Sequence, residues 1–521
     1  MKQENVILPK VCLLNDIPTL FVDGKPFVAL SGEVHNSSAS DPSYMLKKVW
    51  PNVENLNINS LIVPVAWEQI EAEEGKFDFS IPDAIIEQAR ERNIRLILLW
   101  FGLWKNSESM YVPGWMKRDP DTYFLAKRLD GKQYHTISPF CEAAVEKDAN
   151  AFANLMAHIR ETDPDHTVIV IQVENEIGLH VNATGGERDY SKIGNKYYNS
   201  EVPAILQEKL SVSGTWEEAF GEDAAESLMA WAFANAIEKI AKAGKKELDL
   251  PCYCNAWLEQ PPYRAGYGYP SGGPVTKVHP IWRATAPSIF GFGPDIYVGY
   301  AAEIMDLYQK DSNPLFIPEI RKDAVTATYA LYAVAGCNAL CYSPFGIEDV
   351  NMKMEEIEGV PMPVLMALGV DTSALDIVGT APALAESYRI LSNLWSLILE
   401  KRGTKQLQAF IYRHDDKKYH ICKFSKYDIQ INYSRREIHM PDSGGFIIEL
   451  SEDEFLLVGT RYMVQFLPKI GKNVNIDIEM FQEGDWVDGA WKSRRILNGD
   501  ERMMPHVNEL PVIRYIKLFE Y

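Results

Sequence analysis

The stretch TVIVIQVENE, residues 167–176, decides the fold of this sequence. It begins as a run of β-branched and apolar residues, which is typical of a strand buried on both faces, and it ends abruptly in two carboxyl groups and an amide. In parallel α/β folds, ligands bind at the carboxyl ends of the strands, where the polar side chains gather. The stretch therefore predicts a parallel sheet with a functional site at this end.

Similar apolar runs occur on both sides of this stretch and alternate with longer segments of helical period. The helical period is clearest in residues 82–92, 143–160 and 381–401. This alternation is typical of parallel strands joined by crossover helices, and eight such units predict an α/β (β/α)8 TIM barrel. The eight expected strands are residues 27–30, 60–65, 95–101, 167–173, 251–256, 288–292, 314–317 and 338–342.

The length of 521 residues predicts more than one domain, because a single core usually stops growing at about 250–300 residues. After Gly403 the pattern changes to short alternating runs at 408–412, 445–450 and 462–466, separated by turn residues. We expect an N-terminal extension (1–24) in which 11–22 could form a hairpin, a catalytic barrel (25–403), and a C-terminal antiparallel β-sandwich-like domain (404–521).

Composition and charge exclude several classes of function. The chain is 46% hydrophobic and 24% charged, as in an ordinary globular protein, and its formal net charge of −20 would repel nucleic acid and anionic membranes. A secretory signal and a membrane-spanning run are not evident, so we expect a cytoplasmic protein. Seven scattered cysteines and the lack of nucleotide, zincin and nucleophile-elbow motifs predict no metal and no cofactor.

Two glutamates stand where a barrel would place its catalytic groups. Glu176 follows the fourth expected strand and Glu319 follows the seventh, so they face each other across the barrel mouth. Cleavage of a glycosidic bond with retention needs one carboxylic acid and one nucleophilic carboxylate. We predict Glu176 as the acid/base and Glu319 as the nucleophile. Strand alternation alone does not separate Glu176 from Glu174, which would point to the same side of an ideal strand.

Other side chains near the predicted mouth could bind a sugar. Asn175 could hydrogen-bond the sugar 2-hydroxyl, and His35 follows the first strand. Six tryptophans fall at strand ends or in the loops after them, where indole faces could stack on a pyranose, although a single tryptophan is more often part of the core. They are Trp67, Trp100, Trp104, Trp115, Trp257 and Trp282, of which we predict substrate contacts for Trp100, Trp104, Trp257 and Trp282.

Three motifs carry a resemblance to a known family: SGEVH at 31–35, WEQIE at 67–71 with EGKFDF at 74–79, and QVENEIG at 172–178. In this order they resemble glycoside hydrolase family 35, the clan A β-galactosidases. Segments 99–106 and 111–115 resemble the bacterial subgroup with an appended C-terminal β-domain. The resemblance implies a retaining exo-β-galactosidase that acts on a carbohydrate and forms a homo-oligomer. Its Asn-Glu order selects Asn175 and Glu176, with Glu319 as the second carboxylate.

The sequence departs from the family at two strands whose residues touch galactose in better-known members. Tyr-Val-Pro-Trp is replaced by PVAW at 64–67, and Cys-Ala-Glu-Trp by FGLW at 101–104. A β-galactosidase is the leading prediction, and another retaining exo-β-glycosidase (glucosidase, fucosidase, xylosidase or arabinosidase) is the alternative. A non-catalytic carbohydrate-binding barrel is a further alternative. A TIM-barrel aldolase would need a strand-end lysine, for which Lys105 and Lys277 offer no evident setting.

Overall fold

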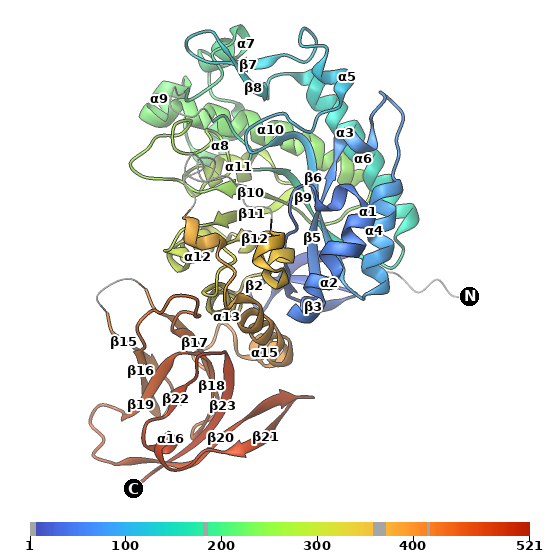
Figure 1. Ribbon diagram of the computed structural model, residues 1–521. Coiled ribbons are helices and arrows are strands. Elements are labelled where there is room, and N and C mark those ends of the chain that lie inside the picture. Colours follow the sequence, from blue (N-terminus) through green and yellow to red (C-terminus); the bar gives the residue numbers. More distant parts are fainter. Residues whose placement is uncertain (1–6, 181–185, 358–370, 414–416) are drawn as a thin grey trace.

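The computed structural model describes residues 7–180, 186–357, 371–413 and 417–521. Its largest part is a barrel of eight parallel strands, drawn in the upper part of Figure 1. A parallel bridge between Glu33 and Ile62 closes the sheet between the first and second strands of the barrel. All eight predicted strands are present, which confirms the predicted fold class. They are β4 (Ala29–Leu30), β5 (Ser60–Ala66), β6 (Arg95–Lys105), β9 (Val168–Asn175), β10 (Cys252–Trp257), β11 (Ile289–Ile296), β12 (Phe316–Ile320) and β13 (Cys341–Pro344).

Helices surround the barrel, and the three that the sequence predicted lie within two residues of their expected bounds. The long helices are α4 (Ser80–Glu91), α6 (Glu142–Thr162), α10 (Ala224–Glu247), α12 (Ala301–Tyr308), α13 (Thr326–Gly336) and α15 (Thr380–Lys401). The shorter ones are η1 (Ser38–Ser40), α1 (Pro42–Tyr44), η2 (Met45–Val49), α2 (Trp50–Val53), η3 (Glu54–Leu56), α3 (Trp67–Ile70), α5 (Gly114–Lys117), α7 (Lys192–Tyr198), α8 (Ala204–Leu210), α9 (Trp216–Phe220), η4 (Gly221–Asp223), η5 (Thr276–Val278), α11 (His279–Thr285), η6 (Lys310–Ser312), η7 (Ile347–Asn351), η8 (Met354–Glu356) and η9 (Thr372–Leu375).

Two small antiparallel sheets accompany the barrel. The N-terminal segment forms a three-stranded sheet of β1 (Lys10–Leu14), β2 (Ile17–Val22) and β3 (Lys25–Phe27), so the hairpin that the sequence allowed at 11–22 is present. Between β6 and α6 the chain forms a ribbon of β7 (Leu125–Lys127) and β8 (Gln133–Ile137).

The C-terminal part consists of two antiparallel sheets, as predicted. A six-stranded sheet and a four-stranded sheet enclose an apolar cluster that includes Phe410, Tyr427, Ile447 and Phe455. The link between α15 and the first strand contains the predicted boundary at 403/404, which stays a proposal. The strands are β14 (Leu407–Ile411), β15 (Tyr419–Lys423), β16 (Tyr427–Tyr433), β17 (Gly444–Ser451), β18 (Glu454–Thr460), β19 (Tyr462–Pro468), β20 (Ile476–Val487), β21 (Ala490–Ile496), β22 (His506–Val507) and β23 (Val512–Glu520), with the short helix α16 (Asp500–Met503).

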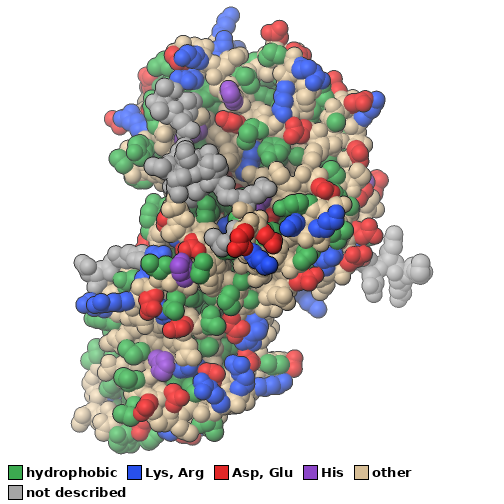
Figure 2. Space-filling model, in the orientation of Figure 1, with side chains coloured by type: hydrophobic (Ala, Val, Ile, Leu, Met, Phe, Trp, Pro, Cys, Tyr) green, Lys and Arg blue, Asp and Glu red, His purple; other side chains and the backbone are tan. Residues whose placement is uncertain are grey.

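Helices α13 and α15 lie between the barrel and the C-terminal sheets (Figure 1). Arg389 of α15 donates a hydrogen bond to Asp485 of β20 at 2.7 Å. Lys and Arg are interspersed with Asp and Glu over the face drawn in Figure 2. Within the described ranges, none of the helices has the length and apolar character needed to cross a lipid bilayer.

Candidate active site

Polar and charged side chains from six of the eight barrel strands gather at the carboxyl end of the barrel. Nearly all of them are buried, although the surrounding strands are apolar, and several carry carboxyl groups whose charges interact. Clusters of titratable groups at the mouth of such a barrel are where active sites are found. The residues are Glu33 after β4, Lys105 at the end of β6, Asn175 and Glu176 at the end of β9, Asn255 of β10, Asp295 of β11 with Tyr297 after it, and Glu319 of β12.

Glu319 is held by three hydrogen bonds. Asn175 Nδ2 donates to Oε1 at 3.0 Å, Asn255 Nδ2 approaches the same atom at 3.4 Å, and Tyr297 Oη donates to Oε2 at 2.7 Å. Burial, together with the charge of Glu319, raises the pKa of the Tyr297 hydroxyl well above its ordinary value, so this group stays a donor. Three donors fix the orientation of the carboxylate and leave it pointing into the mouth of the barrel.

Glu176 lies on the opposite side of this cluster and has a different environment. Its backbone adopts the left-handed region with φ 45°, and its N–H donates to Asn255 Oδ1 at 2.8 Å. Burial and the negative charge of Glu319 raise the pKa of Glu176 to about 7, while Lys105 and a hydrogen bond to Asp295 lower it. A carboxyl group with this pKa keeps its proton near neutral pH and is available as a general acid.

Asn255 links the two glutamates to a third acidic residue. Its Nδ2 donates to Asp295 Oδ2 at 2.7 Å, while its Oδ1 accepts the Glu176 N–H. Asp295 is the direct register partner of Glu319 in the parallel pair β11/β12. Burial and the charges of Glu319 and Glu176 raise the pKa of Asp295 well above its ordinary value.

Lys105 corrects one expectation from the sequence, in which it had no setting near the site. It is the last residue of β6 and is buried in the cluster, where its Nζ donates to Asn175 Oδ1 at 2.8 Å. The reason is a register shift between Trp100 and Lys105 in the β6/β9 pairing, which lets β6 continue beyond its predicted end. The amide of Asn175 is thus fixed between Lys105 and Glu319.

Glu174 points away from this site and into β6. Its carboxyl accepts three backbone N–H groups, from Gly102 at 3.2 Å, Leu103 at 2.8 Å and Trp104 at 2.7 Å. Like Glu176, it has a left-handed backbone, with φ 62°, so β9 does not alternate regularly at its end. Glu174 therefore holds the irregular end of β6, and the structure separates it from Glu176.

Glu33, from the SGEVH motif, contributes another buried carboxyl to the floor of the site. Neither of its oxygens has a hydrogen-bond partner among the described residues. Burial and the charge of Glu319 raise its pKa well above the ordinary value. Together with Asp295, it makes the site strongly acidic, with Lys105 as the cation whose charge acts on these groups.

The aromatic residues predicted to contact substrate fall into two groups. The side chains of Trp100, Trp104 and Trp282 are almost fully buried in the main hydrophobic core, so their indole faces are covered by protein and they do not enter our proposal below. Their indole nitrogens donate to Asp148, to the carbonyl of Ile137 and to the carbonyl of Gly272.

Trp257 and His35 are partly exposed at strand ends. Trp257 is the last residue of β10, and its ring stacks on His180 with centroids 5.3 Å apart. His35 Nε2 lies 2.8 Å from Asp349 Oδ2, and its ring contacts Phe345 edge-on. Both remain candidates for contact with a ligand.

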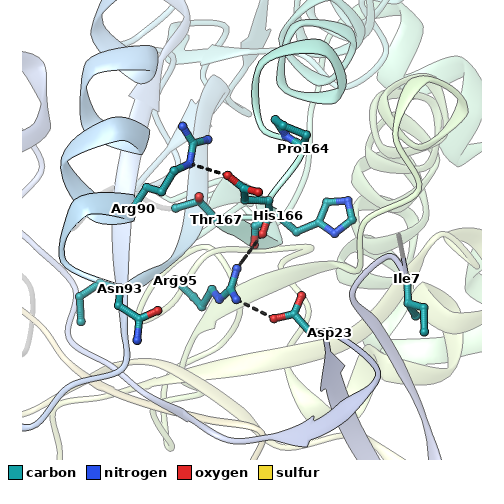
Figure 3. A pocket seen from close by; sticks show the side chains of 10 residues that line it. Ile7, Asp23, Arg90, Asn93, Arg95, Pro164, His166 and Thr167 are labelled. Carbon is teal, nitrogen blue, oxygen red and sulfur yellow. Dashed lines mark hydrogen bonds and ion pairs between the residues drawn. The ribbon is translucent and has the colours of Figure 1, made fainter. Parts of the chain in front are cut away.

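A cavity of about 530 Å3 lies at the opposite end of the barrel (Figure 3). Arg95 at the start of β6 donates to Asp23 at 2.6 Å and to the carbonyl of His166 at 2.8 Å, and Arg90 donates to Asp163 at 2.7 Å. These charges are paired with each other, and the cavity is at the amino ends of the strands. Its groups stabilise the fold, whereas the acidic cluster at the carboxyl ends is the candidate site.

Residues 19–249, which include Glu33, Lys105, Asn175 and Glu176, match the model of glycosyl hydrolases family 35. This match confirms the predicted resemblance and indicates a glycoside hydrolase, as the sequence predicted. Residues 384–507 match a domain of unknown function, DUF5597, which covers most of the C-terminal sheets.

Solved structures with a similar architecture share little sequence with this glycoside hydrolase. The β-amylase catalytic domain from Paenibacillus polymyxa is 11% identical with a TM-score of 0.48, covering 61% of this chain and 92% of that one. β-Galactosidases from Bacillus circulans sp. alkalophilus and Rahnella sp. R3 are 14% and 17% identical with TM-scores of 0.48 and 0.45, covering 72% and 71% of this chain. This chain spans 57% of the length of each β-galactosidase. No curated protein sequence matches it significantly.

Sequence reasoning missed four members of the candidate site: Lys105, Asn255, Asp295 and Tyr297. Each of them stands at or just beyond the end of a barrel strand, which is the signal that selected Glu176 and Glu319. The signal was insufficient because polar residues occur at many strand ends, and only the tertiary structure shows which of them reach the same carboxylates.

Proposed function

We propose that this glycoside hydrolase is a retaining exo-β-glycosidase in which Glu319 is the nucleophile and Glu176 the acid/base, with β-galactosides as its first expected substrates. The proposal rests on the observation that the two carboxyl groups have different environments. Glu319 accepts hydrogen bonds from Asn175 and Tyr297, whereas burial and the charge of Glu319 raise the pKa of Glu176 to about 7. A carboxylate held in place by donors and a carboxyl that keeps its proton supply one nucleophile and one acid.

In the first step, Glu319 Oε attacks the anomeric carbon while the glycosidic bond breaks. The proton of Glu176 moves to the leaving oxygen, so the aglycone departs as a neutral alcohol. The Tyr297 hydroxyl and the Asn175 amide hold the attacking carboxylate in place. The glycosyl group becomes an ester of Glu319.

In the second step, Glu176 has become a carboxylate and removes a proton from water. That water attacks the anomeric carbon, the ester bond to Glu319 breaks, and the sugar leaves with its original configuration. Glu176 has recovered its proton and Glu319 its charge, so the enzyme returns to its starting state. Lys105 favours the anionic form of Glu176 during this half of the cycle.

A second group of sugars is favoured by a specific departure in the site. At the end of β6, where better-known family members carry an Ala-Glu pair that touches galactose, this chain has Gly102 and Leu103, and Lys105 lies in the site. A change in charge at a sugar-contacting strand alters which hydroxyl groups can be bound. We therefore place β-glucosides, β-fucosides, β-xylosides and arabinosides as the alternative substrates.

A panel of nitrophenyl β-glycosides tests the activity and the sugar together. We expect release of nitrophenol from the galactoside, or else from one of the alternative sugars. NMR of the first-formed sugar should show the β-anomer, and an α-anomer would contradict the double displacement. If none of the glycosides in the panel releases nitrophenol, a non-catalytic carbohydrate-binding barrel is favoured.

The roles of the two glutamates have separate tests. Glu319→Gly should abolish hydrolysis and be rescued by azide to give a glycosyl azide of inverted configuration. Glu176→Ala should retain activity mainly on substrates with good leaving groups, because these need no proton. If azide instead gave the inverted glycosyl azide with the Glu176 variant, the roles of nucleophile and acid/base would have to be exchanged.

Location and assembly are part of the same proposal. A cytoplasmic enzyme would act on short imported oligosaccharides or glycosides, and a homo-oligomer is expected. Cell fractionation and sedimentation of the purified chain test these two points.

A further inference from the structure

Asp295 has no role in the mechanism above, although it is the register partner of Glu319 and is linked to Glu176 through Asn255. Its Oδ2 accepts the Asn255 amide at 2.7 Å, and Oδ1 has no N–H or O–H donor among the described residues. Its carboxyl is instead hydrogen-bonded to that of Glu176. Two carboxyl groups form a hydrogen bond only if one of them carries a proton, because two anions repel each other.

We propose that Asp295 is a positioning residue that stays protonated through the reaction and donates a hydrogen bond to the carboxyl of Glu176. This inference rests on the proposed role of Glu176. Asp295 touches neither the sugar nor the leaving group, and acts on the reaction through the orientation and charge of Glu176. No proton leaves Asp295: the proton given to the leaving oxygen comes from Glu176 and returns to it from water.

The surrounding charges explain why Asp295 is the neutral partner. The titratable groups that interact electrostatically with the pair are Glu33 from after β4, Lys105 from β6, Tyr253 from β10, Tyr297 from after β11, Tyr308 from α12 and Glu319 from β12. Glu319 is both the register neighbour of Asp295 and the first charge that acts on it. One lysine among four buried carboxyls does not balance four negative charges, so some carboxyls must keep their protons.

A hydrogen bond of this kind favours the transition state over the ground state. While Glu176 is protonated, the bond joins two neutral groups, and once Glu176 has given up its proton the bond becomes charge-assisted and about twice as strong. The gain appears only as negative charge develops on Glu176, which is the condition for an interaction to increase kcat. Asn255 supports the arrangement, because it bonds both Asp295 Oδ2 and the Glu176 N–H.

Two substitutions of Asp295 should affect the pKa of Glu176 differently. Asp295→Asn keeps a neutral donor facing Glu176, as the protonated Asp295 does, and should leave the basic limb of kcat/KM in place. Asp295→Ala removes the donor and should raise the same limb by about one unit. Asp165→Asn, at the opposite end of the barrel and exposed, is the matched control and should leave the limb unchanged.

The test does not depend on hydrolysis. The Glu176 pKa can be titrated by 13C NMR of glutamate-labelled protein, with its signal assigned from its loss in Glu176→Gln. If wild-type protein hydrolyses no glycoside but this pKa rises in Asp295→Ala and stays in place in Asp295→Asn, the proposed function fails and the inference stands. A lower pKa in Asp295→Asn would show that the wild-type aspartate carries a charge, and an unmoved pKa in Asp295→Ala would show that it donates no hydrogen bond. Either result overturns the inference even in an active enzyme. The Asn variant is isosteric, so its result decides if the Ala variant does not fold.

Discussion

Glu174 and Glu176 stand two residues apart on β9, and each forms a carboxyl pair with a buried aspartate, yet the two pairs do different things. Glu174 pairs with Asp148, and backbone N–H groups of β6 donate to both carboxyls. Glu176 pairs with Asp295, and the Glu176 carboxyl has no backbone donor among the described residues. The first pair is saturated by the protein and stabilises a strand end. The second leaves a carboxyl unsaturated, and we propose that this carboxyl serves the substrate.

The comparison teaches that burial and a raised pKa do not identify a catalytic acid. Burial raises the pKa of both glutamates, that of Glu174 well above its ordinary value and that of Glu176 to about 7. What separates them is the supply of hydrogen-bond donors, since an oxygen that already accepts two backbone N–H groups has no capacity left for a leaving group. A buried polar group whose hydrogen-bonding capacity the protein does not fill is therefore a candidate functional group.

The largest expected effect is a loss of activity at Glu176 without loss of stability. Glu176→Gln should lower kcat/KM about 10²–10⁴-fold on substrates with poor leaving groups, because no proton is available for the departing oxygen. Thermal unfolding should be unchanged within a few degrees. A parallel fall in Tm and activity would instead give Glu176 a structural role like that of Glu174.

Glu174→Ala should produce the opposite result. It leaves the N–H groups of Gly102 and Trp104 without their acceptor in the interior, so the free energy of unfolding should fall by about 3–5 kcal/mol. Denaturant unfolding measures the change. Glu91→Ala on the exposed surface of α4 is the control, with an expected change within about 0.5 kcal/mol.

Gly102→Ala tests the Glu174 pair from the other side. An added Cβ would lie 2.4 Å from Trp100 Nε1 and 2.6 Å from both Asp148 Oδ2 and Glu174 Oε1, so the carboxyl pair would have to shift. We expect a loss of about 1–3 kcal/mol in the free energy of unfolding. Gly299→Ala, where a Cβ would meet nothing within 4 Å, should have little effect. Equal results at both glycines would show that the packing around Glu174 is loose.

The smallest expected effect is a shift in the pH profile from Lys105. Its ammonium group lowers the pKa of Glu176, so Lys105→Met should raise that pKa above about 7. The acid form of Glu176 is the active one, and the basic limb of kcat/KM should therefore move to higher pH, by about one unit or less. Lys117→Met, at an exposed ion pair with Glu68, should leave the limb in place. A limb that moves to lower pH would contradict the assignment of Glu176 as the acid.

Much of the fold could be predicted from the sequence because the signals are local. A barrel strand such as Val168–Asn175 is an unbroken β-branched run, and an outer helix such as Glu142–Thr162 repeats its apolar face every three or four residues. Strand lengths at the mouth were less predictable. The sequence places the end of β6 near Phe101, whereas the structure extends this strand to Lys105. The reason is that Glu174 of the neighbouring strand accepts hydrogen bonds from backbone N–H groups near the end of β6.

The sequence by itself determined the barrel, the C-terminal sheets and the positions of Glu176 and Glu319 at strand ends. These features are local, because apolar periodicity and the polar residues that end each apolar run can be read directly along the chain. Only the tertiary structure decided which carboxyl points into the site. Left-handed backbone angles at Glu174 and Glu176 break the alternation of β9, and the donors that saturate Glu174 come from a strand about 70 residues earlier. Because the hydrogen-bond donors that distinguish Glu174 from Glu176 are distant in sequence, no periodic pattern near either glutamate reveals the difference.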